Sequence, residues 1–444
     1  MFPSPTASLL LLGFSYLAYH LFWLPYCSTS SRWLSGLPWD ATFGDKIETY
    51  GPHMDIVRGQ LTRNLSLVAA AVSYELERAL QSIWPVSSEE WASYKLLSSC
   101  NQIVSRASSC ALGCKELAQI PQFLEHSQDF STALGAAGFL MGKLPLWLRS
   151  LLAPLILFKA NRAFAACLNI TSPIIRKRLA SIQHGKTDDP AYEKPQDFLQ
   201  WLLEATHADP SQVDEARVTG RLLVLNTVAL QTTTLVVANV ILDLYSSPRS
   251  GEWVAELRAE CERVLAEHGG VWTKDAVNSL HRIDSTIKES MRFSDGLDAN
   301  VRRRVVDPNG IKLSDGTWIA PGVMVATPAC CIHRDAQDYP NPDVFDPFRF
   351  FSQGRQSSSA GGGRTEQNSV TALVATTKSF VAFGHGKHAC PGRFFAAFEM
   401  KLMLARIVMD HDVRVKEVER PKYVYMNGFR APSEEIEVLV RLRR

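Results

Sequence analysis

One stretch of sequence, FVAFGHGKHACPGRFF at positions 380–395, constrains this chain more than any other part of it. The stretch holds a single cysteine, Cys390, among three glycines and two histidines, and a proline follows the cysteine directly. Glycines let a backbone take tight conformations and come close to a neighbouring group. A loop with so few side chains around its cysteine therefore needs a reason beyond packing, although a buried inert thiol is the alternative.

The composition excludes several classes of protein. The chain has 444 residues, enough for one large fold or for about three domains. Its 47 basic and 45 acidic residues give a net charge of +2, so no nucleic-acid partner is expected. The nine cysteines are scattered and include no C-x-x-C pair. This spacing argues against a disulfide framework or a zinc site and favours a reducing compartment.

The N-terminal sequence is typical of a membrane helix. No Asp, Glu, Lys or Arg occurs from Thr6 to Tyr26, and most residues there are aliphatic or aromatic. A bilayer core requires about 20 apolar residues, which this stretch supplies. A cleaved signal peptide would carry a basic first region and a small-residue cleavage site, and neither is evident. We expect an uncleaved anchor at residues 1–30, with a signal peptide or a buried helix as alternatives, followed by one domain at 31–444.

A second uncharged run, Leu222–Leu242, competes for the same interpretation. Its middle is polar, with four consecutive polar residues at 231–234, and polar groups are costly in lipid. The run therefore predicts a central buried helix, in which threonine hydroxyls can bond back to i−4 carbonyls and disturb the helical ladder. Satisfied core threonines are the alternative explanation.

The residue pattern of the chain changes near Ser294, from helical periodicity to short β-branched runs and turns. Segments 214–223, 252–268 and 280–293 carry apolar positions three and four apart, which predicts helices. After Ser294, β-branched runs alternate with Pro-Asn-Gly, Asp-Gly and Pro-Gly turns, which predicts short strands. Residues 352–371 form a low-complexity loop rich in Ser and Gly.

Two further patterns concern charge pairs. Glu289 and Arg292 are three residues apart on one helical face, where they can pair, although such pairs are usually solvated surface neighbours. Arg349 lies between phenylalanines in YPNPDVFDPFRFF, and an arginine in that apolar setting requires a carboxylate.

The cysteine stretch matches the pattern F-x-x-G-x-R/H-x-C-x-G with Phe383, Gly386, His388, Cys390 and Gly392. In this the chain resembles the cytochrome P-450 haem-thiolate monooxygenases, and its other motifs follow in that family's order. The resemblance implies a mainly α fold with small β-sheets, preceded by the N-terminal membrane helix. Only about thirty residues separate the anchor from HMDIVRGQLTRNL, so the resemblance also implies a shortened N-terminal sheet region.

The same resemblance implies haem b, iron protoporphyrin IX, with the Cys390 thiolate as axial ligand. Gly386 and Gly392 would leave room for backbone N–H donors to approach the sulfur, and these donors tune the thiolate. A thiolate ligand favours O–O cleavage. His388 would meet a haem propionate, and Phe383 would pack beside the thiolate.

Further roles follow from the resemblance. Glu289, Arg292 and Arg349 are similar to the family's structural triad, which acts in folding and takes no part in the chemistry. Two guanidinium groups would keep a buried Glu289 charged. Arg63 is a candidate propionate ligand.

The stretch VALQTT at 228–233 is similar to the family's oxygen-activation motif, [AG]-G-x-[DE]-T-[TS]. Thr232 occupies the position of the threonine that delivers protons. The chain departs from the pattern at Gln231, which replaces the usual acid, and at Val228, which replaces a small residue. A glutamine cannot exchange a proton as a carboxylic acid does, so we expect water relayed through Thr232 to supply it.

The resemblance implies NADPH- and O2-dependent monooxygenation, with electrons from NADPH-cytochrome P-450 reductase. It places the chain at the endoplasmic reticulum membrane, with a single-pass anchor and a cytoplasmic catalytic domain. The motifs look most like filamentous-fungal members that act on apolar terpenoid, meroterpenoid or indole-derived intermediates of secondary metabolism. Two alternatives remain: a haem-thiolate isomerase, dehydratase or peroxide-using enzyme, which Gln231 favours, and a non-catalytic membrane-anchored remnant, which the short N-terminal region favours.

Overall fold

The computed structural model describes residues 51–84, 87–184, 194–294, 296, 298–352, 371–417, 419–426 and 429–443. The anchor expected at residues 1–30 lies outside these residues. So does the low-complexity loop expected at 352–371, apart from its two end residues.

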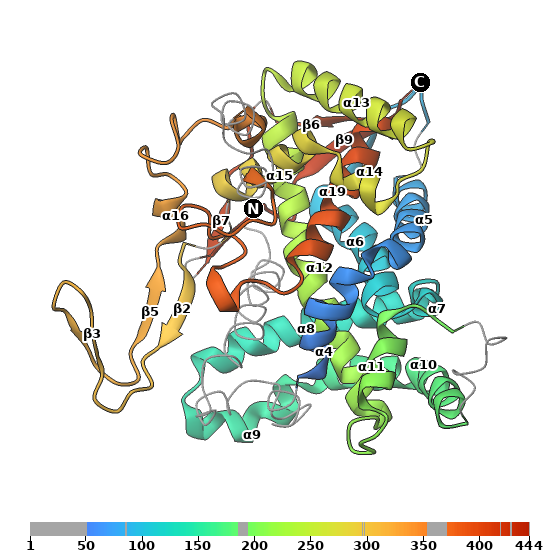
Figure 1. Cartoon of the computed structure of the whole chain (residues 1–444), viewed down its shortest axis with the longest axis vertical. Helices are drawn as coiled ribbons and strands as arrows, with labels where there is room; N and C mark the ends of the chain where they lie inside the picture. The colour runs from blue at the N-terminus through green and yellow to red at the C-terminus, as the bar shows by residue number, and fades with distance from the viewer. Residues whose placement is uncertain are drawn as a thin grey trace.

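Helices dominate the described chain, as the sequence predicts (Figure 1). They are α4 (Pro52–Ile56), the π-helix η2 (Val57–Leu61), α5 (Leu65–Ile83), α6 (Leu96–Leu112), α7 (Lys115–Ala118), α8 (Pro121–Lys143), α9 (Leu146–Ile156), α10 (Phe158–Gln183), α11 (Phe198–Thr206), α12 (Glu215–Tyr245), α13 (Ser250–Glu267), α14 (Lys274–Asn278), α15 (His281–Phe293), α16 (Ala329–Ile332), the 3-10 helix η4 (Gly386–His388) and α19 (Arg393–Asp410).

The sheets are small. The strands are β1 (Ala92–Lys95), β2 (Asn300–Arg304), β3 (Ile311–Lys312), β4 (Trp318–Ile319), β5 (Met324–Thr327), β6 (His411–Val415), β7 (Val424–Met426), β8 (Phe429–Ala431) and β9 (Glu437–Leu442). They form one three-stranded sheet in the order β1-β9-β6 and three antiparallel pairs, β2-β5, β3-β4 and β7-β8. The strands predicted after Ser294 and the helices predicted at 214–223, 252–268 and 280–293 are confirmed.

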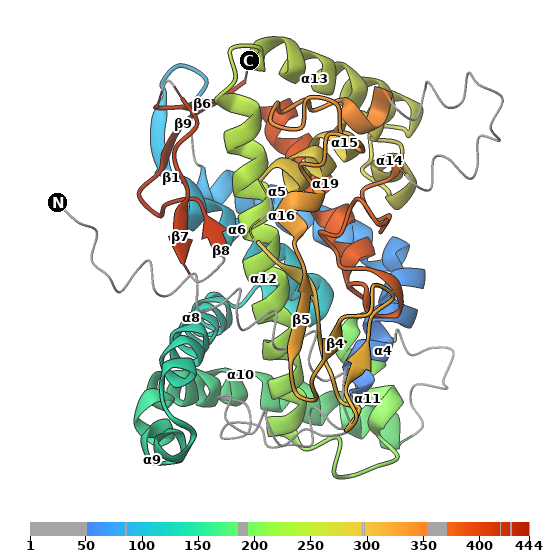
Figure 2. The same cartoon turned by 90° about the vertical axis from the view of Figure 1, so that its left-hand side faces the viewer.

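Helix α12 runs through the middle of the molecule in both views (Figures 1 and 2). The Asp214 side chain caps its start by accepting a hydrogen bond from the backbone N–H of Arg217 at 3.1 Å. The helix packs against α6, α8, α10, α15 and α19. Among the described helices it alone is long and apolar enough to cross a membrane, yet 78% of its apolar window is buried inside the protein. The prediction of a central buried helix is confirmed.

One narrow stripe of α12 remains accessible. Between positions 218 and 244 every residue is buried except Ala229, Thr232 and Val236. These positions are spaced i, i+3 and i+7, so they share one face of the helix. The predicted disturbance by threonine is wrong for the backbone, because α12 continues unbroken although the Thr232 hydroxyl donates to the Val228 carbonyl at 2.9 Å.

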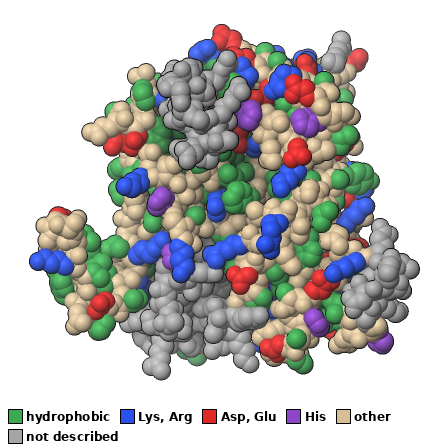
Figure 3. Space-filling model, in the orientation of Figure 1, with side chains coloured by type: hydrophobic (Ala, Val, Ile, Leu, Met, Phe, Trp, Pro, Cys, Tyr) green, Lys and Arg blue, Asp and Glu red, His purple; other side chains and the backbone are tan. Residues whose placement is uncertain are grey.

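An arm made of β2–β5 and β3–β4 protrudes from the helical body (Figure 1). Its tip carries apolar side chains on the surface, including Ile311, Leu313 and Trp318, which is 60% exposed. Green atoms mark this apolar arm in the space-filling view (Figure 3).

Candidate active site

The cysteine loop connects Phe380 to the start of α19. The backbone N–H of Cys390 donates to the Phe383 carbonyl at 2.8 Å, which closes the loop, and Phe383 itself lies in the core. Gly386 has a φ of +67°, a conformation that L side chains rarely adopt. A Cβ there would meet no protein atom within 4 Å, so within the protein itself Gly386 serves the backbone conformation.

Two opposing effects act on the Cys390 thiol. Burial raises its pKa, while hydrogen bonds from the backbone N–H groups of Gly392 and Arg393 and the positive charges of Arg393 and Arg58 oppose that rise. Arg393 also donates to the Cys390 carbonyl at 2.9 Å and so holds the loop against the helix start. This environment supports a thiolate once a metal ion adds the missing positive charge.

Two arginines from distant segments converge on the cysteine loop beside His388. Burial and the charges of Arg303, Lys387 and Arg58 lower the pKa of His388, which shows that both arginines lie close to it. Arg58 comes from η2, Arg303 from β2 and His388 from η4. Cationic and N–H donors of this kind bind carboxylates such as the two propionates of haem. Together with the Cys390 sulfur, these residues fit a haem.

The backbone of β2 is strained next to Arg303. Val301, a β-branched residue, has a φ of +50°, and the pairing of β2 with β5 shifts register between Asn300 and Arg303. Such a conformation costs about 1–3 kcal/mol and persists only where the surrounding structure enforces it. The bulge re-aims the side chains that follow it, as bulges beside functional sites commonly do.

The structure places Arg58, and not the sequence candidate Arg63, among the charges that act on Cys390 and His388. Arg63 is exposed, and its guanidinium lies against Gly59, 3.3 Å from where a Cβ would stand. Sequence reasoning also missed Arg303. The signal was present in Arg302–Arg304, because successive side chains of a strand point to opposite faces and Arg303 therefore faces away from Arg302 and Arg304.

Glu289, Arg292 and Arg349 meet in one buried cluster. Arg292 donates to both carboxylate oxygens of Glu289 at 2.8 Å, and Arg349 Nε lies 3.0 Å from both. Glu289 and Arg292 are fully buried, and the side chain of Arg349 is 7% exposed. Surface pairing, the alternative for Glu289 and Arg292, is therefore wrong.

The two guanidinium groups use their remaining N–H donors on backbone carbonyls. Arg292 Nη1 donates to His333 at 2.7 Å and to Pro342 at 2.8 Å, and Arg349 donates to Pro340 at 2.6 Å and Val344 at 2.9 Å. The cluster thereby fastens the segment 333–344 to α15. A buried ion pair needs such additional hydrogen bonds to offset its desolvation.

The polar residues at the midpoint of α12 point in different directions. Thr232 lies on the accessible stripe with Ala229 and Val236. Gln231 is buried elsewhere on the helix, where its Nε2 donates to Ser131 at 3.3 Å and its Oε1 has no hydrogen-bond partner. The Thr234 hydroxyl is also buried and has no protein hydrogen-bond partner.

Gln231 and Thr234 line a polar pocket of about 350 Å³ between α6, α8 and residues 434–435. Its wall also includes Asn101, Gln128 and Asp129. Buried polar atoms that face such a space are normally satisfied by water. The position of the usual acid is thus occupied here by an amide that faces a polar pocket.

A buried carboxyl that sequence reasoning missed contacts α12 as well. Glu399 on α19 is fully buried, accepts a hydrogen bond from Ser108 at 2.8 Å and is contacted by the Thr233 side chain. Burial raises its pKa to about 8, and the two hydrogen bonds offset only part of that rise. No sequence pattern distinguishes this glutamate from a surface one, except that its neighbours in the helix are all apolar or aromatic save Lys401.

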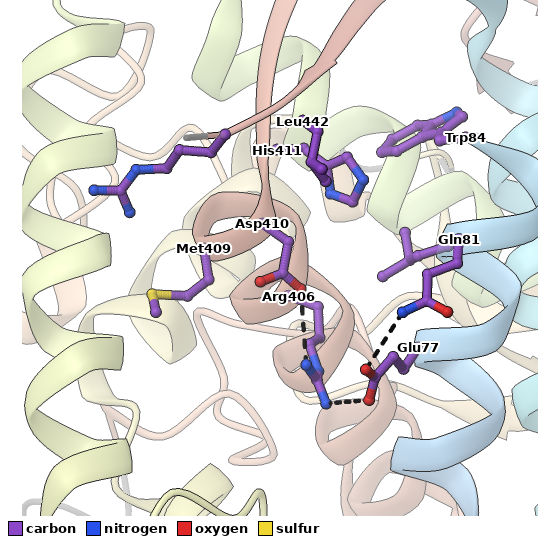
Figure 4. Close-up of a pocket in the computed structure, with 10 residues that line it drawn as sticks. Glu77, Gln81, Trp84, Arg406, Met409, Asp410, His411 and Leu442 are labelled. Carbon is purple, nitrogen blue, oxygen red and sulfur yellow. Dashed lines mark hydrogen bonds and ion pairs between the residues drawn. The ribbon is translucent and has the colours of Figure 1, made fainter. Parts of the chain in front are cut away.

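A separate pocket of about 470 Å³ lies between α5 and the end of α19 (Figure 4). Arg406 crosses it and pairs with Glu77 at 2.9 Å and with Asp410 at 3.7 Å. His411 is buried at its edge, and this burial lowers the histidine pKa to about 4. None of the residues predicted for the site lines this pocket.

Comparisons with known proteins agree with this geometry. The Cytochrome P450 family model matches residues 90–440. Cytochrome P450 monooxygenase gloP from Glarea lozoyensis is 39% identical over 401 residues, which cover 88% of this chain and 72% of that protein. Cytochrome P450 monooxygenase htyF from Aspergillus rugulosus is 40% identical over 377 residues, which cover 83% of this chain and 55% of that protein. The chain therefore spans about half the length of htyF.

Two solved structures share the fold. The cytochrome P450DA heme domain aligns with a TM-score of 0.63 at 19% identity, over 98% of this chain and 87% of that chain. The retinoic acid-bound cyanobacterial CYP120A1 aligns with a TM-score of 0.65 at 19% identity, over 94% and 84%. The expected mainly α fold with small β-sheets is thus confirmed. The chain belongs to the cytochrome P450 family and is a cytochrome P450 monooxygenase, an oxidoreductase whose cofactor is haem b with a cysteine thiolate as axial ligand.

Proposed function

We propose that this chain inserts one oxygen atom from O2 into an apolar natural-product intermediate of terpenoid, meroterpenoid or indole-derived class, with Cys390 as the iron ligand. The single observation that carries the proposal is the Cys390 sulfur, which accepts hydrogen bonds from Gly392 and Arg393 while Arg58, Arg303 and His388 converge beside it. Haem bound there supplies oxygen activation.

The protein's own residues divide the remaining tasks. The accessible stripe of α12 presents two apolar side chains, Ala229 and Val236, and one hydroxyl, Thr232. Apolar positions suit an apolar substrate, and the hydroxyl can hold a proton at Oγ1 by turning from the Val228 carbonyl toward the site. Because Gln231 cannot exchange a proton as an acid does, water must supply the proton that Thr232 passes on.

The electron donor in this proposal is NADPH-cytochrome P-450 reductase at the endoplasmic reticulum membrane. The apolar stretch Thr6–Tyr26 would anchor the chain there and leave the catalytic domain in the cytoplasm. Microsomes that contain the reductase should therefore support turnover with NADPH, and chain purified without reductase should not turn over with NADPH.

The carbon monoxide complex of the reduced, haem-loaded chain tests the iron ligand. A thiolate ligand gives a red-shifted absorption band, and Cys390→Ala should abolish it. Cys331→Ser is the matched control, since it removes a thiol outside the loop. An unchanged band in Cys390→Ala would remove the central assignment.

Gln231 favours one second candidate, a haem-thiolate isomerase, dehydratase or peroxide-using enzyme that needs no proton relay. The two candidates differ in what they consume. Monooxygenation consumes NADPH and O2 in step with product, whereas the second candidate forms product without NADPH. Product formation in the absence of NADPH would decide for the second candidate.

A further inference from the structure

Two adjacent cysteines lie at the surface on α16. Their sulfur atoms are 3.9 Å apart, Cys331 is exposed and Cys330 is partly exposed. All other described cysteines outside the cysteine loop are buried: Cys100, Cys110, Cys114, Cys167 and Cys261. Burial raises the pKa of each of these thiols and keeps oxidants away from their sulfur atoms. Partial burial and the neighbouring Cys331 and Asp298 raise the pKa of Cys330 as well, so Cys331 is the thiol of the pair that reacts first. Outside the cysteine loop, the accessible thiol chemistry of the described chain is therefore concentrated in this pair.

One residue connects the pair to the site. His333 follows two positions after Cys331, is fully buried, and accepts a hydrogen bond at Nε2 from the backbone N–H of Val381 at 3.0 Å. Its carbonyl accepts from Arg292 at 2.7 Å, and its ring stacks on Phe380 at 5.4 Å. His333 thus joins α16 to both the Glu289 cluster and the first residues of the cysteine loop.

We propose that Cys330 and Cys331 form a vicinal dithiol that hydrogen peroxide oxidises to a disulfide, and that the oxidation loosens the cysteine loop through His333. The inference depends on the proposed function only for the source of peroxide, which a monooxygenase releases when turnover is uncoupled. Peroxide added to the protein tests the pair without turnover.

The reaction balances with peroxide as the only oxidant. The Cys331 thiolate attacks one peroxide oxygen, the O–O bond breaks, and a sulfenic acid and hydroxide form. The Cys330 thiolate then attacks the sulfenic sulfur, the S–S bond forms and hydroxide leaves. In total two thiols lose two protons and two electrons, and one peroxide becomes two waters. Thioredoxin or dithiothreitol reverses the step by thiol–disulfide exchange.

The geometry explains why oxidation reaches the loop. A disulfide requires a sulfur separation of about 2.05 Å, so the two sulfurs must approach from 3.9 Å. The bond closes a small ring that contains the Cys330–Cys331 peptide, and the four-residue helix must change to accommodate it. The hydrogen bonds that build α16 include His333 N–H to the Ala329 carbonyl at 2.9 Å, so a change in the helix moves His333.

The experiment uses the haem-loaded chain treated with hydrogen peroxide, alkylated and digested with trypsin. The peptide 313–334 contains both cysteines, and we expect it to lose two hydrogens and escape alkylation, with recovery after dithiothreitol. Transfer of haem to apomyoglobin should become about tenfold faster after oxidation, as expected for the loss of roughly one buried hydrogen bond. Cys331→Ser and Cys330→Ser should show neither change.

The outcomes separate the two parts of the proposal. Two alkylated thiols after peroxide treatment would overturn the dithiol, and so would oxidation to sulfinic acid without a disulfide. A disulfide that leaves haem transfer unchanged would overturn the coupling through His333. Failure of the proposed function would appear differently. Product would form without NADPH, while added peroxide would still form the disulfide and speed haem transfer.

Discussion

Glu399→Gln is the substitution whose effect the structure specifies best. The carboxyl is fully buried, its pKa is raised to about 8 by that burial, and it lies between α19, α6 and α12. In the unfolded chain the same group titrates near its ordinary value of 4.5. Below 4.5 the group is protonated in both states, so Glu399 costs the fold no stability there.

The contribution of Glu399 to stability then falls as the pH rises. Between 4.5 and 8 the unfolded chain releases a proton that the folded protein retains, which favours unfolding. One pKa unit corresponds to about 1.36 kcal/mol, so the fold loses about 5 kcal/mol over this window. The free energy of unfolding of a whole domain is only about 5–15 kcal/mol, so this one carboxyl changes a large fraction of it. Glutamine keeps hydrogen-bonding capacity toward Ser108 and Thr233 and cannot ionise.

We therefore expect Glu399→Gln to match the parent near pH 5 and to exceed it by several kcal/mol at pH 9. The assay is urea unfolding of the haem-loaded protein at pH 5, 7 and 9, followed by far-ultraviolet circular dichroism and by the haem band. Glu75→Gln is the matched control. Glu75 is also fully buried, but its carboxyl faces Arg106 at 3.8 Å and accepts from Gln119 at 2.8 Å. Its loss should therefore destabilise the protein at neutral pH. Parallel pH dependences in Glu399→Gln and the parent would refute the reasoning.

Three further outcomes are expected. Thr232→Ala should raise peroxide release per NADPH consumed with little change in substrate binding; equal coupling in variant and parent would point to another proton route. Glu289→Gln should lower the unfolding free energy by about 3–5 kcal/mol, because it leaves buried guanidinium charge uncompensated. The exposed pair Arg263–Glu267 provides its control, since Glu267→Gln should cost under about 1 kcal/mol; similar losses in both would contradict the buried cluster's importance. Arg58→Ala should weaken haem retention about tenfold, as expected for a lost charge-assisted hydrogen bond, while Arg63→Ala should have little effect; the reverse order, measured by haem transfer to apomyoglobin, would restore Arg63 as the candidate.

Much of the site could be anticipated because its parts are contiguous in sequence. Cys390 and the glycines around it share one loop, and the N–H donors that reach the sulfur belong to the next two or three residues of the same turn. Glu289 and Arg292 are three positions apart on one helix, so helical geometry alone brings them to one face. The polar midpoint within an uncharged run likewise indicated that α12 is buried by protein.

Tertiary structure decided what depends on segments that are distant in sequence. Arg58, Arg303 and His388 approach one another only after η2, β2 and the cysteine loop pack, and no local rule prefers Arg58 to Arg63. For the same reason, the sequence could not tell which way the side chains of Gln231, Thr232 and Thr233 face. Successive residues of a helix are rotated by about 100°, and the neighbouring helices alone determine which of these directions is polar. The physical cause is the distance along the sequence over which each property is determined. Backbone conformation and i, i+3 pairing depend only on a few neighbouring residues. Burial, by contrast, and with it the protonation of Glu399, is set by whichever elements the whole chain packs around a group.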